Sequence, residues 1–148
     1  MRRRAQGIII RNNMALFGYG KSNNEFKHAF IGGGIEGQEE PEEALIRELR
    51  EETNIEGKII FKFKNEIKEE RYTFLVDIGD QQCILGFDPE EVSLPDEEKS
   101  LQQLIWIPLK EKDRFTSIDM SYFKLLLEEC KGINYYPDWL SELKELVT

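Results

Sequence analysis

The stretch GGIEGQEEPEEALIRELREETNI, residues 33–55, joins a glycine-rich turn to a strongly helix-forming segment. Glycines let the backbone lie close to a ligand, and Pro41 favours the first turn of a helix. At about 100° per residue, Glu48, Glu51 and Glu52 fall on one narrow strip of that helix, beside a stripe of apolar residues. We therefore expect the helix to bury one side and to present carboxylates along the border of that side.

We call Glu48, Glu51 and Glu52 the acidic strip. Like charges three or four residues apart destabilise a helix by roughly 0.3 kcal/mol per pair, so we expect a positively charged group to neutralise this strip. Hard divalent cations prefer oxygen ligands, and Mg²⁺ binds through a few carboxylates together with waters and substrate phosphates. The alternative is a solvated acidic helix, which is common among Glu-rich segments. That alternative explains neither the glycine triplet at residues 32–34 nor the border position of the acids.

The segment resembles the Nudix box, whose pattern is G, five residues, E, seven residues, R-E-U, one residue, E-E, one residue, G-U, with U aliphatic. The matching positions are Gly33, Glu39, Arg47, Glu48, Leu49, Glu51, Glu52 and Ile55. One position differs, because Asn54 stands where the family has glycine. Asparagine tolerates the left-handed backbone that ends many helices, so we expect little damage to the helix end.

This resemblance implies an α/β fold, a Nudix-type α/β/α sandwich with a mixed central sheet. It implies hydrolysis of a nucleoside diphosphate linked to a group X, with Mg²⁺ as the cofactor and Mn²⁺ as a possible substitute. Glu48 and Glu52 would bind the metal, and Glu51 would join a second metal or activate water. Arg47 would hold these carboxylates, and Gly32 would lend a backbone carbonyl to the metal. Such a metal can bridge phosphate oxygens and polarise phosphorus.

Acids outside the helix are further candidates. The resemblance gives Glu39 the role of tying the loop to the helix, and it suggests that another acid comes from a loop before the last strand. Glu97 and Glu98 are the candidates in the acidic stretch DPEEVSLPDEEK, residues 88–99. The alternative for this stretch is a solvated loop. A choice between the two acids requires a carboxylate within reach of the attacking water.

Four residues are candidates for contact with a substrate. Gly33 and Gly34 belong to the glycine turn, where backbone can approach a ligand. Arg4 begins the first predicted strand and is the best placed of three consecutive arginines to reach phosphates; the alternative role is solubility. Tyr72 either stacks on a base or, as most strand tyrosines do, packs across the sheet.

The resemblance leaves the substrate open, because the Nudix box binds the shared pyrophosphate and X is recognised elsewhere. Our hypothesis is a nucleoside triphosphate or a modified or damaged nucleotide. Dinucleoside polyphosphates and nucleotide sugars are alternatives. A catalytically retired binding or regulatory domain is another, but it would be expected to lose Arg47, Glu48, Glu51 or Glu52, and all four are present.

Length and charge narrow the class of protein further. A chain of 148 residues suits one domain, residues 1–148. The net charge of −9 argues against a nucleic acid polymer as partner, whereas bound divalent ions permit a nucleotide. The basic start MRRRAQ precedes an apolar run too short for a signal or a membrane span. Without a disulfide or metal pattern for its two cysteines, we expect a cytoplasmic protein with no membrane partner; a homodimer stays open.

Apolar alternation, helical spacing and turn residues predict the remaining elements. Strands are expected over residues 4–10, 14–17, 26–31, 58–67, 69–78 and 104–109. A tight turn is expected at Asn12 and Asn13, and a polar loop over residues 19–24. Helices are expected over residues 117–131 and 137–147, on the face of the sheet opposite the acidic helix.

Overall fold

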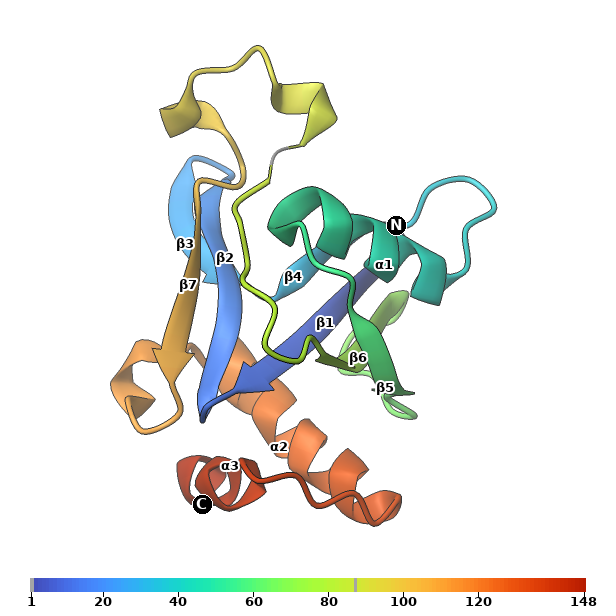
Figure 1. Ribbon diagram of the computed structural model, residues 1–148, viewed down its shortest axis with the longest axis vertical. Coiled ribbons are helices and arrows are strands. Elements are labelled where there is room, and N and C mark those ends of the chain that lie inside the picture. The colour runs from blue at the N-terminus through green and yellow to red at the C-terminus, as the bar shows by residue number, and fades with distance from the viewer. Residues whose placement is uncertain (1, 87) are drawn as a thin grey trace.

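The acidic helix packs on one face of a central sheet, and two C-terminal helices cover the other face (Figure 1). The computed structural model describes residues 2–86 and 88–148. The acidic helix is α1 (Pro41–Thr53), and the opposite layer holds α2 (Ser117–Gly132) and α3 (Leu140–Val147). This arrangement is the predicted α/β/α sandwich, and its sheet is mixed.

One half of the sheet is built around the N-terminal strand β1 (Arg4–Arg11). This strand pairs parallel with β6 (Arg71–Asp77) and antiparallel with β4 (Ile31–Gly34). Strand β5 (Lys58–Lys62) then pairs antiparallel with β6. The β4 glycines therefore lie on a strand directly beside β1.

The other half consists of β2 (Met14–Ser22), flanked by the antiparallel strands β3 (Glu25–Ala29) and β7 (Gln103–Pro108). Only two residue pairs, next to the turn, join β1 to β2. The turn is the predicted one, since Asn12 and Asn13 have φ angles of 53° and 59°. Beyond it the strands diverge, and the two halves of the sheet separate.

Side chains of β1 alternate between the two helical layers, as period-two strand geometry requires. Ile8 and Ile10 belong to the core beneath α2 and α3, whereas Ile9 belongs to the core beneath α1. Leu45 and Leu49 of α1 are fully buried in that second core. The apolar stripe of α1 is thus fixed on the sheet, which places its acidic border at the edge.

The C-terminal end of α1 forms in spite of the substituted Nudix-box glycine. Asn54 adopts the left-handed conformation, with φ 57° and ψ 34°, and its N–H donates to the carbonyl of Arg50 at 3.1 Å. Its side-chain amide also donates to the carbonyl of Ile84 at 2.8 Å. Asparagine therefore preserves the helix end and adds a tie to a distant loop.

The predicted polar loop over residues 19–24 is wrong. Strand β2 continues through this region, and the chain turns at Asn23 and Asn24, whose φ angles are 50° and 65°. A two-residue turn with positive φ at both positions is the usual connection of a tight hairpin. The segment is strand because it pairs with β3 on one side and with β7 on the other.

Other boundaries also differ from the prediction. The strand expected over residues 26–31 is interrupted at Phe30, so that β3 and β4 join different halves of the sheet. Strands β5 and β6 stop short of the turn between them, and α3 begins at Leu140 instead of Pro137. Within residues 2–86 and 88–148, no helix has the length and apolar character that a bilayer crossing requires.

Candidate active site

A cavity of about 570 Å³ opens where the two halves of the sheet diverge. The acidic strip of α1, Glu48, Glu51 and Glu52, lines one side of it, next to the glycines of β4 at residues 32–34. Glycines of β2 and two pieces of the loop before β7 line the other parts. The fold therefore brings the predicted acids and the predicted glycines into one cavity, although these glycines belong to strand β4 and not to a turn.

Arg47 connects the acidic strip to the glycine strand. Its Nη1 donates to Glu48 Oε1 at 3.0 Å and to Glu51 Oε2 at 3.4 Å. Its Nη2 donates to the carbonyl of Gly34 at 2.9 Å. Charge-assisted bonds of this kind are strong and directional, so the guanidinium fixes the position of both carboxylates.

The same guanidinium also binds the loop acid Glu39. Arg47 Nε donates to Glu39 Oε2 at 2.8 Å, and Nη2 donates to Glu39 Oε1 at 3.0 Å. These bonds with Arg47, followed by the backbone N–H of Glu36, lower the pKa of Glu39 to about 2. Glu39 thus joins the loop to the helix, which is the contact that the sequence predicts for it.

Glu52 is the most enclosed acid of the strip. Burial, and then the charge of Glu48, raises its pKa to about 8. Burial also raises the pKa of Glu48, although Arg47 opposes this effect. A carboxylate in an enclosed site is costly to ionise without a positive partner, so this end of the cavity favours a cation.

The glycines of β4 approach the acids directly. The N–H of Gly32 donates to Glu52 Oε2 at 3.2 Å, and the carbonyl of Gly34 accepts from Arg47, so both face α1. Because the N–H and C=O of one strand residue point to the same edge, the Gly32 carbonyl also faces α1. A Cβ at Gly33 would collide with the carboxylate of Glu48. A side chain at this position would displace that carboxylate from its place beside the strand.

These residues fit a divalent cation by donor type, since carboxylate and carbonyl oxygens are the ligands that hard cations prefer. Among residues 2–86 and 88–148, no three His, Cys, Asp or Glu side chains are spaced to hold one ion together. Arg47 binds Glu48 and Glu51, while Glu52 accepts from Gly32. Mg²⁺ commonly binds through a few carboxylates and completes its coordination with water and phosphate oxygens, which suits these donors.

Basic side chains also line the cavity. Arg2 and Arg4 reach it from the start of the chain, and Lys27 reaches it from β3. Arg3 does not, because it pairs with Glu70 at 3.3 Å. This alternation follows from the period of an extended chain. The sequence favoured Arg4 and gave no signal for Lys27, whose position depends on the pairing of β3 with β2.

Tyr72 lies outside the residues that line the cavity. The guanidinium of Arg3 lies 5.5 Å from its ring centroid, and Lys62 Nζ lies 4.8 Å from it. The ring also packs against the core beneath α1. This position corresponds to the packing alternative for Tyr72 and not to base stacking.

Glu97 and Glu98 are exposed on a short 3-10 helix, Asp96–Glu98, and do not line the cavity. Asp88 and Glu90 line it instead. The chain reaches this position because the N–H of Gly86 donates to the carbonyl of Glu52 at 2.8 Å. Ile84 makes a similar bond to the carbonyl of Thr53.

Gly86 is the residue in the sequence that could have indicated this contact of the loop with α1. A Cβ at Gly86 would collide with the backbone carbonyl of Glu51. The glycine therefore lets the loop lie directly on the end of α1. The charge of Asp88 acts on Glu48 and contributes to its raised pKa.

The cavity combines three features: acids held by one arginine, a glycine strand that faces those acids, and basic side chains. Together these features indicate the class of protein. They suit an enzyme that binds a polyphosphate through divalent ions.

A family model described as the NUDIX domain matches residues 1–126. The chain therefore belongs to the Nudix family and is a pyrophosphohydrolase. Nudix hydrolases generally use divalent metals and act on small nucleotide substrates. No curated protein sequence matches the chain.

Solved structures show the same fold. A hydrolase of the NUDIX family from Clostridium perfringens has a TM-score of 0.58 and 14% identity, over 92% of this chain and 98% of that chain. The MutT protein from Methanosarcina mazei Go1 has a TM-score of 0.55 and 19% identity, over 91% and 96%. A UDP-X diphosphatase has a TM-score of 0.56 and 18% identity, over 89% and 64%.

Proposed function

We propose that the chain hydrolyses the pyrophosphate link of a nucleoside triphosphate, or of a modified or damaged nucleotide, with Mg²⁺ as cofactor and Mn²⁺ as a possible substitute. This proposal depends on one observation, which is that acidic and basic side chains line the same cavity. The acidic strip of α1 lies in the same cavity as Arg2, Arg4 and Lys27. A polyphosphate can bind to divalent ions at the acids while its remaining oxygens accept from the basic side chains.

Glu48 and Glu52 would hold the metal, together with the carbonyl of Gly32. Their enclosed position and raised pKa values support this assignment, because a cation would favour their ionised forms. When bound, the metal polarises phosphorus and neutralises charge on the anhydride oxygens. Arg47 keeps Glu48 and Glu51 in place.

The substrate would lie between the glycine strand and the basic side chains. Gly33 and Gly34 let Glu48 and Arg2 lie against the backbone at this side of the cavity. Arg4 would donate to phosphate oxygens from the start of β1. Orientation by several fixed groups lowers the entropic cost of bringing water and phosphorus together.

The reaction transfers one proton to the protein. A water oxygen forms a bond to phosphorus, the bridging P–O bond of the anhydride breaks, and the water proton passes to a carboxylate. Glu51 is the first candidate for this base, since 32% of its side chain is exposed, against 15% for Glu48. Asp88 is the second, because it lines the cavity from outside the Nudix box.

A nucleotide panel tests this proposal. Nucleoside triphosphates, oxidised nucleotides, dinucleoside polyphosphates and nucleotide sugars are incubated with Mg²⁺ or Mn²⁺, and the products are separated by ion-exchange chromatography. Water labelled with ¹⁸O identifies the phosphorus that is attacked. A triphosphate should give a monophosphate and pyrophosphate. Absence of turnover on every compound with either metal would contradict the proposal.

A nucleotide sugar is the second candidate substrate, because the chain shares its fold with a UDP-X diphosphatase. The same panel separates the two candidates, since a nucleotide sugar yields a sugar phosphate. A retired binding domain gains no support from the site, where Arg47 joins Glu48 and Glu51 in one network.

A further inference from the structure

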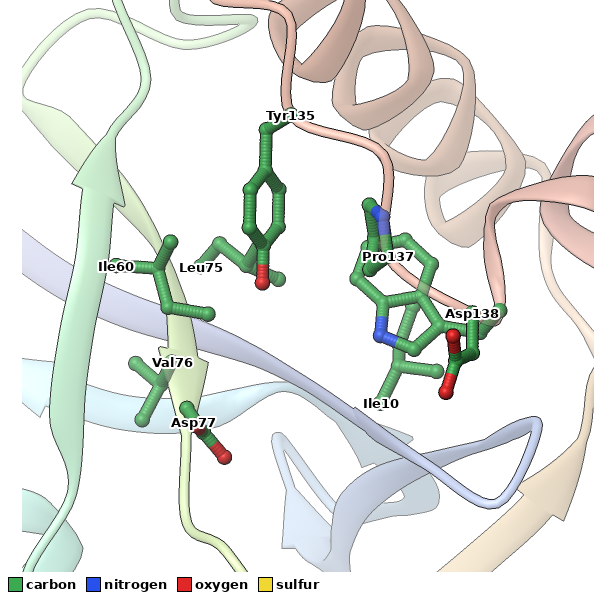
Figure 2. Close-up of a pocket in the computed structure, with 9 residues that line it drawn as sticks. Ile10, Ile60, Leu75, Val76, Asp77, Tyr135, Pro137 and Asp138 are labelled. Carbon is green, nitrogen blue, oxygen red and sulfur yellow. The ribbon is translucent and has the colours of Figure 1, made fainter.

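A second cavity, of about 300 Å³, lies on the face of the sheet opposite α1 (Figure 2). Its floor is apolar and includes Ile10, Ile60 and Leu75, from three different strands. The segment between α2 and α3 forms its other side, through residues 135–139. None of the residues that line it also lines the cavity of the acidic strip.

Two carboxylates border this second cavity from different elements. Asp77 ends β6, and Asp138 belongs to the segment between α2 and α3; Figure 2 shows the two side chains on separate sides of the cavity. Within residues 2–86 and 88–148, neither carboxylate forms an ion pair within 4.0 Å. In this part of the chain, Lys58 is the register partner of Asp77 on β5 but forms no ion pair with it within 4.0 Å. Asp77 Oδ1 accepts the N–H of Gly79 at 2.8 Å.

Aromatic side chains form the walls. Tyr135 and Trp139 both line the cavity, and Figure 2 shows the Tyr135 ring directed from the α2–α3 segment toward the strands. Its position is fixed, because its N–H donates to the carbonyl of Cys130 at 2.9 Å and its ring packs edge-on against Phe61.

We propose that this second cavity binds a small organic cation with two ammonium or guanidinium groups on an aliphatic stem. Asp77 and Asp138 would each accept charge-assisted hydrogen bonds from one cationic end. The apolar floor would bury the methylenes, and the faces of Tyr135 and Trp139 would attract the positive charge.

The dimensions of the cavity select a small molecule. A volume of about 300 Å³ is at the lower end of the range for ligand pockets, which suits a diamine or an aminoalkyl guanidine. This inference does not depend on the proposed nucleotide hydrolysis, because the two cavities lie on opposite faces of the sheet.

Isothermal titration calorimetry with putrescine and agmatine tests the inference at moderate salt, which suppresses general attraction to a chain of net charge −9. The variants are Asp77→Asn, Asp138→Asn and the double variant. Asp113→Asn is the matched control, because Asp113 is exposed on the 3-10 helix Lys112–Arg114. The neutral compound 1,4-butanediol controls for the aliphatic stem.

The double variant should weaken amine binding by about tenfold, because both carboxylates are exposed and the two lost charge-assisted bonds together remove about 1.4 kcal/mol. Asp113→Asn should bind as the unchanged chain does, and butanediol should not bind. Glu48→Gln should also keep amine binding, which excludes capture by the acidic strip. Unchanged affinity in the double variant, loss of binding in Glu48→Gln, or absence of binding by either amine at millimolar concentration would each overturn the inference. Amide NMR spectra verify that the variants are folded.

Discussion

Replacing Glu52 by glutamine should strongly reduce turnover and, at the same time, stabilise the metal-free protein. Glutamine keeps the shape of the side chain, and its amide oxygen can still accept the N–H of Gly32 that now reaches Glu52 Oε2 at 3.2 Å. Glutamine lacks the negative charge of Glu52, to which we assign the role of binding the metal. The two effects have opposite signs, which separates a functional acid from a structural one.

The size of the stability change follows from the pKa of Glu52. Burial, followed by the charge of Glu48, raises this pKa from 4.5 to about 8 in the metal-free protein. A folded-state pKa above the unfolded value means that ionisation opposes folding, so stability is lost as the pH rises from about 4.5 to about 8. At 1.36 kcal/mol per unit, this loss is about 3 kcal/mol at pH 7 and about 5 kcal/mol above pH 8. The uncharged variant avoids it.

Thermal unfolding in chelator and steady-state turnover in Mg²⁺ measure the two effects. Glu52→Gln should unfold roughly 10 °C above the unchanged chain at pH 7 in chelator. Its turnover should fall by about a thousandfold, which corresponds to about 4 kcal/mol of transition-state stabilisation. Added Mg²⁺ should raise the unfolding temperature of the unchanged chain more than that of the variant.

Glu56→Gln is the matched control, because Glu56 is exposed and pairs with Arg50 on the surface at 2.6 Å. Exposed pairs of this kind contribute little, so both stability and turnover should change only slightly. Retained turnover in Glu52→Gln, or a lower unfolding temperature of this variant in chelator at pH 7 to 8, would contradict a metal-binding role of Glu52.

Three further variants test the surroundings of the acidic strip. Gly33→Ala should reduce turnover at least tenfold, because its Cβ would collide with a carboxylate of the acidic strip. Gly132→Ala is the control and should not reduce turnover, because the space around Gly132 is open. Circular dichroism verifies that both variants are folded. Asp88→Asn should lower kcat by about a hundredfold if it is the base outside the Nudix box, and Glu98→Gln should leave kcat unchanged; equal effects would remove the assignment. Arg47→Lys should lose the bidentate bonds that keep the pKa of the loop acid near 2. That depressed pKa contributes stability above about pH 4.5 that is lost toward pH 2, so the variant should show a smaller acid-induced decrease in unfolding temperature; an unchanged decrease would argue against this bond.

Local chemistry explains why much of the fold could be predicted from the residues alone. The acidic and apolar stripes of α1 follow from helical spacing, and its end at Asn54 follows from the tolerance of asparagine for left-handed backbone. The turn at Asn12 and Asn13 has the same cause. The loop prediction over residues 19–24 failed because that segment becomes strand only through partners elsewhere in the chain.

The candidate site likewise contains residues that could be predicted from local sequence and residues that could not. Spacing within one helix was enough to group Glu48, Glu51 and Glu52, since residues three and four apart share a helical face whatever the rest of the chain does. Sequence spacing does not predict that Asp88, and not Glu98, lines the cavity, because this depends on the path of the loop before β7. It does not predict Lys27 there either, because the position of Lys27 depends on the pairing of β3. Side chains that belong to one element are related by its fixed geometry, whereas side chains from separate elements meet only after the whole sheet has paired and the helices have packed on it.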